Sequence, residues 1–128
     1  IDMGTATTLS VADKKGNYIG GVILPGLRVS LNSLSGKTAQ LPYISLEVPG
    51  KVIGKNTIDC MRAGIVFSNV DMLDGILDRM EKELGEAPAV IATGGLARFI
   101  TPLCRHEIIF DDALLLKGLL ILYRKNTQ

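Results

Sequence analysis

The residue types that could bind a phosphate are concentrated in the first eight positions of the chain. Asp2 precedes Gly4, and hydroxyl side chains follow at Thr5, Thr7 and Thr8. Glycine lets a backbone approach a ligand closely, and successive N–H groups in such a turn bind anions. The carboxylate at the end of the strand can hold a cation. A simple glycine turn does not need three nearby hydroxyls, so we interpret these residues as a nucleotide phosphate site.

A second glycine turn, Thr93-Gly94-Gly95, follows the apolar run 88–92. A tight strand-to-helix connection would explain the glycines, and so would close approach of the backbone to the sugar or base of a nucleotide. The place of the turn at the end of an expected strand favours the second explanation. Thr57 stands at an expected helix N-terminus, where a hydroxyl can cap the helix and the free N–H groups favour an anionic ligand.

The elements that must position these motifs follow from the spacing of apolar and turn residues. In the first part of the chain we expect a strand before Gly4, an antiparallel hairpin at 5–13 and 18–24, and a helix from Leu27 to near Gly36. An extended loop at 39–50 should follow, and then a long helix that is capped by Asn56 or Thr57 and ended by Gly85. In the last part we expect a strand at 88–92, a helix from about Leu96, a strand at 107–110 and an apolar helix at 114–123. This alternation predicts an α/β fold. Gly20 and Gly21 indicate either a β-bulge or the close approach of another backbone or a ligand.

The composition restricts the class of protein. Of the 128 residues 47% are hydrophobic, which is enough for the core of one domain. With 14 Lys and Arg against 13 Asp and Glu, the net charge of +1 provides no dense basic face for direct nucleic-acid binding. No apolar run is long enough to cross a bilayer. Two cysteines, Cys60 and Cys104, are too few for a disulfide framework and indicate reduced thiols in a cytosolic protein.

Two side chains have ordinary structural interpretations. His106 is the only histidine, which argues against a histidine-based metal cluster or catalytic dyad, and we expect it on the surface. Cys60 lies within the expected long helix, so we expect its thiol to pack in the interior.

Six segments in order resemble the type III pantothenate kinases of the actin-like ATPase superfamily, also described as the Bvg accessory factor family. They are residues 1–9, 20–27, 34–42, 52–58, 91–98 and 116–126. The resemblance implies a ribonuclease H-like domain, with a mixed sheet, an antiparallel hairpin at its start and helices packed on it. It also implies that residues 1–128 are the C-terminal half of a two-half, cytoplasmic kinase whose N-terminal half is absent from this chain. The start at Ile1 inside an expected strand leads to the same expectation.

The reaction implied by the resemblance is phosphorylation of pantothenate by ATP, the first step of coenzyme A synthesis. The expected requirements are a homodimer, a monovalent cation (K⁺ or NH₄⁺) and Mg²⁺. By position Asp2 resembles the cation-binding acid of the family and Thr5 its ATP-contacting threonine. Thr57 resembles the threonine that contacts pantothenate, and the Gly94-Gly95 turn resembles the adenosine side of the nucleotide cleft.

Two motifs of the family are missing from the chain. Neither a D-x-G-N phosphate loop nor the G-x-D-R segment that supplies the general base occurs. We therefore expect no catalytic residue in this chain and no activity from it alone. Two alternatives remain open on the same scaffold: an accessory transcriptional regulator that acts without direct DNA contact, and a kinase of the same superfamily that phosphorylates a sugar or acetate.

Overall fold

The structure, a computed structural model, describes residues 1–37 and 45–128. The expected extended loop at 39–50 and the matching segment 34–42 therefore lie partly outside the described residues. Within the described ranges, no helix combines the length and the apolar character needed to span a bilayer.

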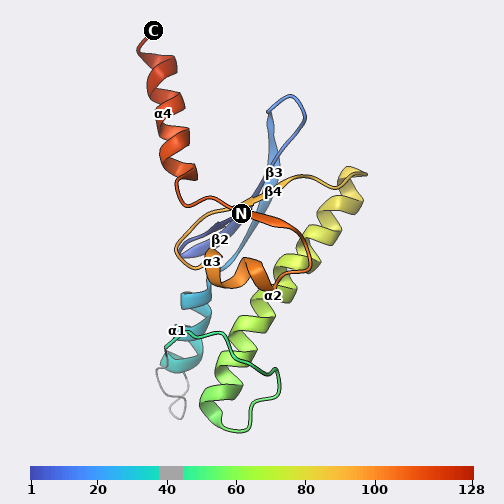
Figure 1. The fold of residues 1–128 in the computed structure, drawn as a ribbon, viewed down its shortest axis with the longest axis vertical. Coiled ribbons are helices and arrows are strands. Elements are labelled where there is room, and N and C mark those ends of the chain that lie inside the picture. The colour runs from blue at the N-terminus through green and yellow to red at the C-terminus, as the bar shows by residue number, and fades with distance from the viewer. Residues whose placement is uncertain (38–44) are drawn as a thin grey trace.

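The chain opens with three antiparallel strands (Figure 1). Strands β1 (Asp2–Met3), β2 (Ala6–Ala12) and β3 (Tyr18–Pro25) lie in this order in the sheet. The β2–β3 register shifts between Val11 and Ala12, where the sheet has a bulge. An added Cβ at Gly21 would collide with the carbonyl oxygen of Leu9 on β2. Both structural explanations of the Gly20-Gly21 pair are therefore correct.

Two parallel strands extend this sheet on the other side of β1. Strand β4 (Val90–Ala92) pairs in parallel with β5 (Ile108–Phe110). A parallel bridge joins Asp2 to Thr93: the Met3 N–H donates to the Thr93 carbonyl oxygen at 2.9 Å, and the Thr93 N–H donates to the Ile1 carbonyl oxygen at 2.8 Å. Across this bridge the order is β3-β2-β1-β4-β5, a mixed sheet that confirms the expected α/β fold with its initial hairpin.

Among the described residues, four α-helices accompany the strands, and the longest of them is capped at both ends. They are α1 (Leu27–Lys37), α2 (Thr57–Leu84), the short α3 (Ala97–Ile100), which continues as a 3₁₀ helix (Thr101–Leu103), and α4 (Leu114–Asn126). Helix α2 is capped by Asn56, whose side-chain oxygen accepts a hydrogen bond from the Asp59 N–H at 2.9 Å. It ends at Gly85, which adopts the left-handed conformation with φ 74°.

One face of the sheet is buried beneath α1, α2 and α3. Met3, Leu9 and Ala92 point to this face and are 2%, 3% and 0% exposed. They belong to a single core whose other buried members are Leu27, Leu31, Met61, Ile65, Val66, Val70, Leu73, Leu77, Val90, Ala97 and Ile100. This core holds the strand ends in place, and the candidate site lies on those ends.

The opposite face of the sheet is open. Ile23, Ile91 and Ile109 point to it and are 79%, 40% and 56% exposed. Asp2 lies on this face because it pairs with Thr8, which in turn pairs with Ile23. Helix α4 does not cover the face: it extends away from the other elements (Figure 1) and has no buried residue.

Of the two caps expected for α2, Asn56 is the one observed, and Thr57 is the first helical residue. Two other expectations about single residues are wrong. Cys60 is exposed, because its side of the first turns of α2 faces away from the core that the next residue, Met61, enters. His106 is not a surface residue: its side chain is only 12% exposed, because its Nδ1 lies 2.7 Å from the buried Asp74 carboxylate.

Candidate nucleotide-binding site

The β1–β2 turn presents the predicted phosphate residues at the end of β1. Asp2, Gly4 and Thr5 are all exposed there. An added Cβ at Gly4 would lie 3.5 Å from Asp2 Oδ1, so the carboxylate lies beside the glycine of the turn. An exposed carboxylate oxygen beside a glycine backbone is a suitable donor set for a hard cation next to a bound phosphate.

Backbones from two other segments pack against this turn, each through a glycine. An added Cβ at Gly26 would collide with the Thr5 carbonyl oxygen, and one at Gly94 would lie 2.6 Å from the Met3 carbonyl oxygen. Gly94 also has φ 104°, a conformation that L side chains rarely adopt. These glycines therefore bring the starts of α1 and α3 beside the β1–β2 turn.

The second predicted glycine turn meets the first at one edge of the sheet. Because β1 and β4 run parallel, their carboxyl ends lie at the same edge, and the Asp2–Thr93 bridge joins them there. Gly95 is exposed, and an added Cβ would meet no other atom within 4 Å. The structure thus brings Asp2, Gly4 and Gly95 together at the edge where open α/β sheets bind ligands.

Thr7 is placed differently from the other predicted phosphate residues. Its side chain is 1% exposed and lies on the core face of β2, opposite Met3. Within residues 1–37 and 45–128 its hydroxyl oxygen has no hydrogen-bond partner. The hydroxyl therefore lies beneath the turn and not on its open side, and a phosphate contact from Thr7 stays a prediction.

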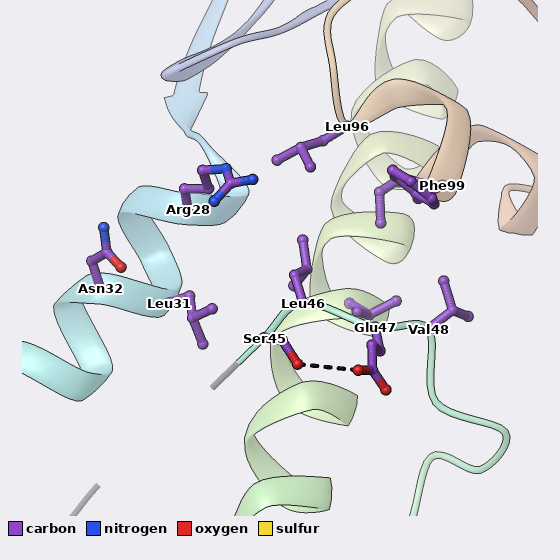
Figure 2. Close-up of a pocket in the computed structure, with 11 residues that line it drawn as sticks. Arg28, Leu31, Asn32, Ser45, Leu46, Glu47, Val48, Leu96 and Phe99 are labelled. Atoms are coloured by element: carbon purple, nitrogen blue, oxygen red, sulfur yellow. Dashed lines mark hydrogen bonds between the residues drawn. The ribbon is translucent and has the colours of Figure 1, made fainter. Parts of the chain in front are cut away.

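A cavity of about 420 Å³ lies between α1, α2 and α3, next to the Gly94-Gly95 turn (Figure 2). Arg28, just after Gly26, and Leu96, just after Gly95, point toward one another across it, and Phe99 lines the same side as Leu96. The remaining lining residues come from α1, α2, α3 and the segment before α2: Leu31, Asn32, Ser45, Leu46, Glu47, Val48, Val66 and Ile100. The apolar side chains beside Arg28 suit a flat heteroaromatic ring, and the polar side chains of Asn32, Ser45 and Glu47 offer it hydrogen-bonding groups.

The same edge of the sheet carries an ion pair that the sequence did not reveal. Asp111 follows β5 and lies 2.6 Å from Lys117 Nζ on α4. The hydrogen bond from Lys117 holds the pKa of the Asp111 carboxyl below its ordinary value. The Asp111 N–H donates to the Ala92 carbonyl oxygen at 2.8 Å, which ties the pair to the end of β4. The only sequence signal for this pair was an acidic residue, Asp111, directly after a short expected strand.

Thr57 lies apart from these residues. Its side chain is exposed in the first turn of α2, which lies at the lower end of the molecule, whereas β1 starts near the centre (Figure 1). The same turn contains the Asp59 carboxylate, which accepts a hydrogen bond from the Asn56 amide at 2.8 Å. The structure therefore does not bring Thr57 and Asp2 together within one copy of the chain.

The strand order and the glycine-threonine turn at the ends of parallel strands define a ribonuclease H-like domain of the actin-like ATPase class. A family model described as "Type III pantothenate kinase" matches residues 1–79. A crystal structure of a protein from Campylobacter jejuni, named for the Baf family of transcriptional activators, has the same fold. Its TM-score is 0.66 at 25% identity, over 98% of this chain and 56% of that one.

Curated relatives agree with the family model. Proteins named type III pantothenate kinase are 46% identical in Citrifermentans bemidjiense, 44% in Geotalea daltonii and 40% in Syntrophus aciditrophicus, over 98%, 100% and 99% of this chain. The chain belongs to the type III pantothenate kinase family. It spans about half the length of these relatives, 50% of each.

Proposed function

We propose that this chain is the C-terminal half of a cytoplasmic kinase that transfers the γ-phosphoryl group of ATP to pantothenate, the first step of coenzyme A synthesis. The observation that carries the proposal is the meeting of the Asp2–Thr5 turn and the Gly94-Gly95 turn at one edge of the sheet. Membership of the type III pantothenate kinase family supports the choice of donor and acceptor.

Phosphoryl transfer asks a protein mainly for positioning and for neutralisation of charge. In this proposal the backbone and the Thr5 hydroxyl, both exposed at the β1–β2 turn, bind the phosphates of ATP. The exposed Asp2 carboxylate holds the monovalent cation (K⁺ or NH₄⁺). Mg²⁺ would neutralise the phosphates when bound. The close approach of Gly26 and Gly94 fixes the shape of this turn.

The cavity beside Gly95 is the proposed place for the base of the nucleotide. It starts directly after the Gly94-Gly95 turn and is lined by Leu96 and Phe99 on one side and by Arg28, two residues after Gly26, on the other. A base in this cavity would leave its phosphates pointing toward Gly4 and Thr5. Gly95 then lies between base and phosphates, where only a residue without a side chain leaves room for the sugar.

The acceptor side of the site requires groups from outside this copy of the chain. Thr57, the predicted pantothenate contact, lies apart from Asp2, and no general base is expected among residues 1–128. The N-terminal half would supply the base that removes the proton from the pantothenate hydroxyl. A homodimer would allow Thr57 of a second copy to contact the acceptor.

The open surfaces of the chain support the two-half arrangement. Ile23, Ile91 and Ile109 leave one face of the sheet apolar and uncovered, and α4 exposes a further row of large apolar side chains: Leu115, Leu116, Leu119, Leu120, Ile121, Leu122 and Tyr123. Apolar surfaces of this extent mark sites of contact with other protein. We assign this contact to the N-terminal half, because the relatives are about twice as long as this chain.

A regulatory role is the second candidate, because the similar structure from Campylobacter jejuni is named as a transcriptional activator. The balanced charge of 14 basic against 13 acidic residues does not favour direct DNA contact.

Identification of the product tests the proposal. The full-length protein is incubated with ATP and, in separate reactions, with pantothenate, acetate or a hexose, and the products are identified by mass spectrometry. The proposal predicts phosphopantothenate and no phosphorylated acetate or sugar. Phosphorylation of another acceptor, or of none, would contradict it.

A further inference from the structure

A cluster of metal-ligating side chains lies at the edge of the sheet opposite the nucleotide site. His106 precedes β5, whereas the phosphate turns follow the carboxyl ends of β1 and β4. Asp78 and Glu81 face the imidazole from α2, where positions three apart lie on the same side of a helix. One potential ligand atom from each of the three side chains lies within 4.8 Å of the other two.

A buried carboxylate orients the imidazole. Asp74 Oδ1 lies 2.7 Å from His106 Nδ1, and the Asp74 side chain is only 3% exposed. The same carboxylate accepts hydrogen bonds from the Arg105 N–H at 2.8 Å and from the His106 N–H at 3.1 Å, which fix its position. With Nδ1 bound to this carboxylate, Nε2 is the ring nitrogen that faces Asp78 and Glu81, the arrangement of carboxylate–histidine–metal triads.

The distances at Nε2 fit a metal better than a proton. Nε2 lies 3.2 Å from Asp78 Oδ1 and 3.4 Å from Glu81 Oε1. Two ligand atoms that are each about 2.1 Å from a tetrahedral zinc lie about 3.4 Å apart. A charge-assisted N–H···O⁻ bond is about 2.7–2.9 Å long, which is shorter than either distance. The two separations at Nε2 are those expected of ligand atoms that share one metal ion.

The surroundings also fit a divalent ion. Two carboxylates face one imidazole nitrogen here, and their two negative charges suit a divalent cation. Arg105 binds the other Asp78 oxygen, Oδ2, at 2.8 Å, which leaves Oδ1 directed at the imidazole. Nitrogen and oxygen ligands of this kind suit zinc and neighbouring transition metals.

We propose that His106, Asp78 and Glu81 form a structural site for a divalent transition metal, with zinc as its representative, and that Asp74 positions the histidine. The metal would fix the segment between the 3₁₀ helix and β5 to α2. Because β5 runs from this site to Asp111, which follows it at the nucleotide edge, the site stabilises the sheet that carries the phosphate turns and does not contact the reacting atoms.

Metal binding to the full-length protein tests this proposal. The protein is stripped with EDTA, and Zn²⁺ is titrated by calorimetry while Co²⁺ binding is followed by visible absorption. We expect one Zn²⁺ per chain, a higher Tm with Zn²⁺, and tetrahedral Co²⁺ bands that His106→Gln removes. Glu81→Gln should weaken Zn²⁺ binding at least tenfold without removing a core side chain, and Asp74→Asn about 10–100-fold.

Glu83→Gln is the matched control, because Glu83 is an exposed carboxylate on the same helix outside the cluster. It should bind Zn²⁺ like the wild type. Equal Zn²⁺ affinity in the wild type, Glu81→Gln and Glu83→Gln proteins would overturn the proposal. So would the absence of Zn²⁺ uptake, which would mean that a proton on Nε2 joins the imidazole to the carboxylates.

Discussion

At the scale of single residues, Gly94 and Gly95 are neighbours with different surroundings. An added Cβ at Gly94 would lie 2.6 Å from the Met3 carbonyl oxygen at φ 104°, whereas one at Gly95 would meet nothing within 4 Å. We expect Gly94→Ala to lower the free energy of unfolding by about 1–3 kcal/mol. Gly95→Ala should change it by less than about 0.5 kcal/mol. Denaturant unfolding of the full-length protein measures both.

The same pair separates stability from ligand binding. A methyl group at Gly95 would enter the space proposed for the sugar of ATP, so Gly95→Ala should raise the KM for ATP several-fold in a protein of normal stability. A normal KM for ATP in Gly95→Ala would show that bound ATP does not lie against this residue.

Thr5 and Thr57 are predicted to contact different substrates. Thr5→Val keeps the shape of the side chain and removes its hydroxyl, which should raise the KM for ATP about tenfold if one hydrogen bond of about 1–1.5 kcal/mol is lost. Thr57→Ala should raise the KM for pantothenate more than the KM for ATP. Ser10→Ala, an exposed hydroxyl further along β2, is the control. Unchanged kinetics in both variants would make these site assignments wrong.

The Cys104 thiol gives a prediction that depends on pH. Burial, and then the charges of Asp74 and Asp71, raise the pKa of Cys104 to about 11. Only the thiolate reacts readily with iodoacetamide. Labelling of Cys104 in the folded protein should therefore stay slow at pH 8 and accelerate toward pH 11, as peptide mapping by mass spectrometry would show. Rapid labelling at pH 8, at the rate of the urea-unfolded protein, would contradict the burial of this thiol.

Single residues were predictable where a local motif defines them. Asp2, Gly4 and Thr5 stand out within a few residues of sequence, and they do lie together. His106 was misjudged, because its partner Asp74 is 32 positions away and only the packing of α2 against the chain before β5 joins them.

At the scale of elements, helix α4 exposes large apolar side chains on its surface. Leu116 and Leu120 are 67% and 46% exposed and lie one helical turn apart. If α4 were exposed in the full-length protein, replacing both with Gln would change the free energy of unfolding by less than about 0.5 kcal/mol per site. If the N-terminal half covers α4, as we propose, the double variant should lose about 3–6 kcal/mol.

Thermal unfolding of full-length protein distinguishes these cases. Lys125→Gln, in the last turn of the same helix, serves as the control and should leave the Tm unchanged. A double variant as stable as this control would show that α4 has no partner.

The elements themselves were largely predictable. Asn56 and Gly85 delimit α2, and Pro25-Gly26 separates β3 from α1, because caps and breakers act locally. The pairing of β1 with β4 was not predictable, since Asp2 and Thr93 are 91 positions apart and no local pattern encodes which strands meet.

At the scale of the whole molecule, the sheet order β3-β2-β1-β4-β5 brings two distant glycine turns to one edge. The fold class followed from the alternation of helices and strands, together with the resemblance. The composition of the whole site could not be predicted in the same way. Thr57 lies apart from Asp2, and the general base is assigned to the other half of the protein.

The central claim is pantothenate-dependent phosphoryl transfer at the Asp2–Thr5 turn. The most direct test measures ADP release by the full-length protein with and without pantothenate, in K⁺ or Na⁺ as the only monovalent cation, for the wild type and Asp2→Asn. We predict ADP release that requires pantothenate, is faster in K⁺, and falls at least tenfold in Asp2→Asn. ATP binding without pantothenate-dependent ADP release in either cation would contradict the claim.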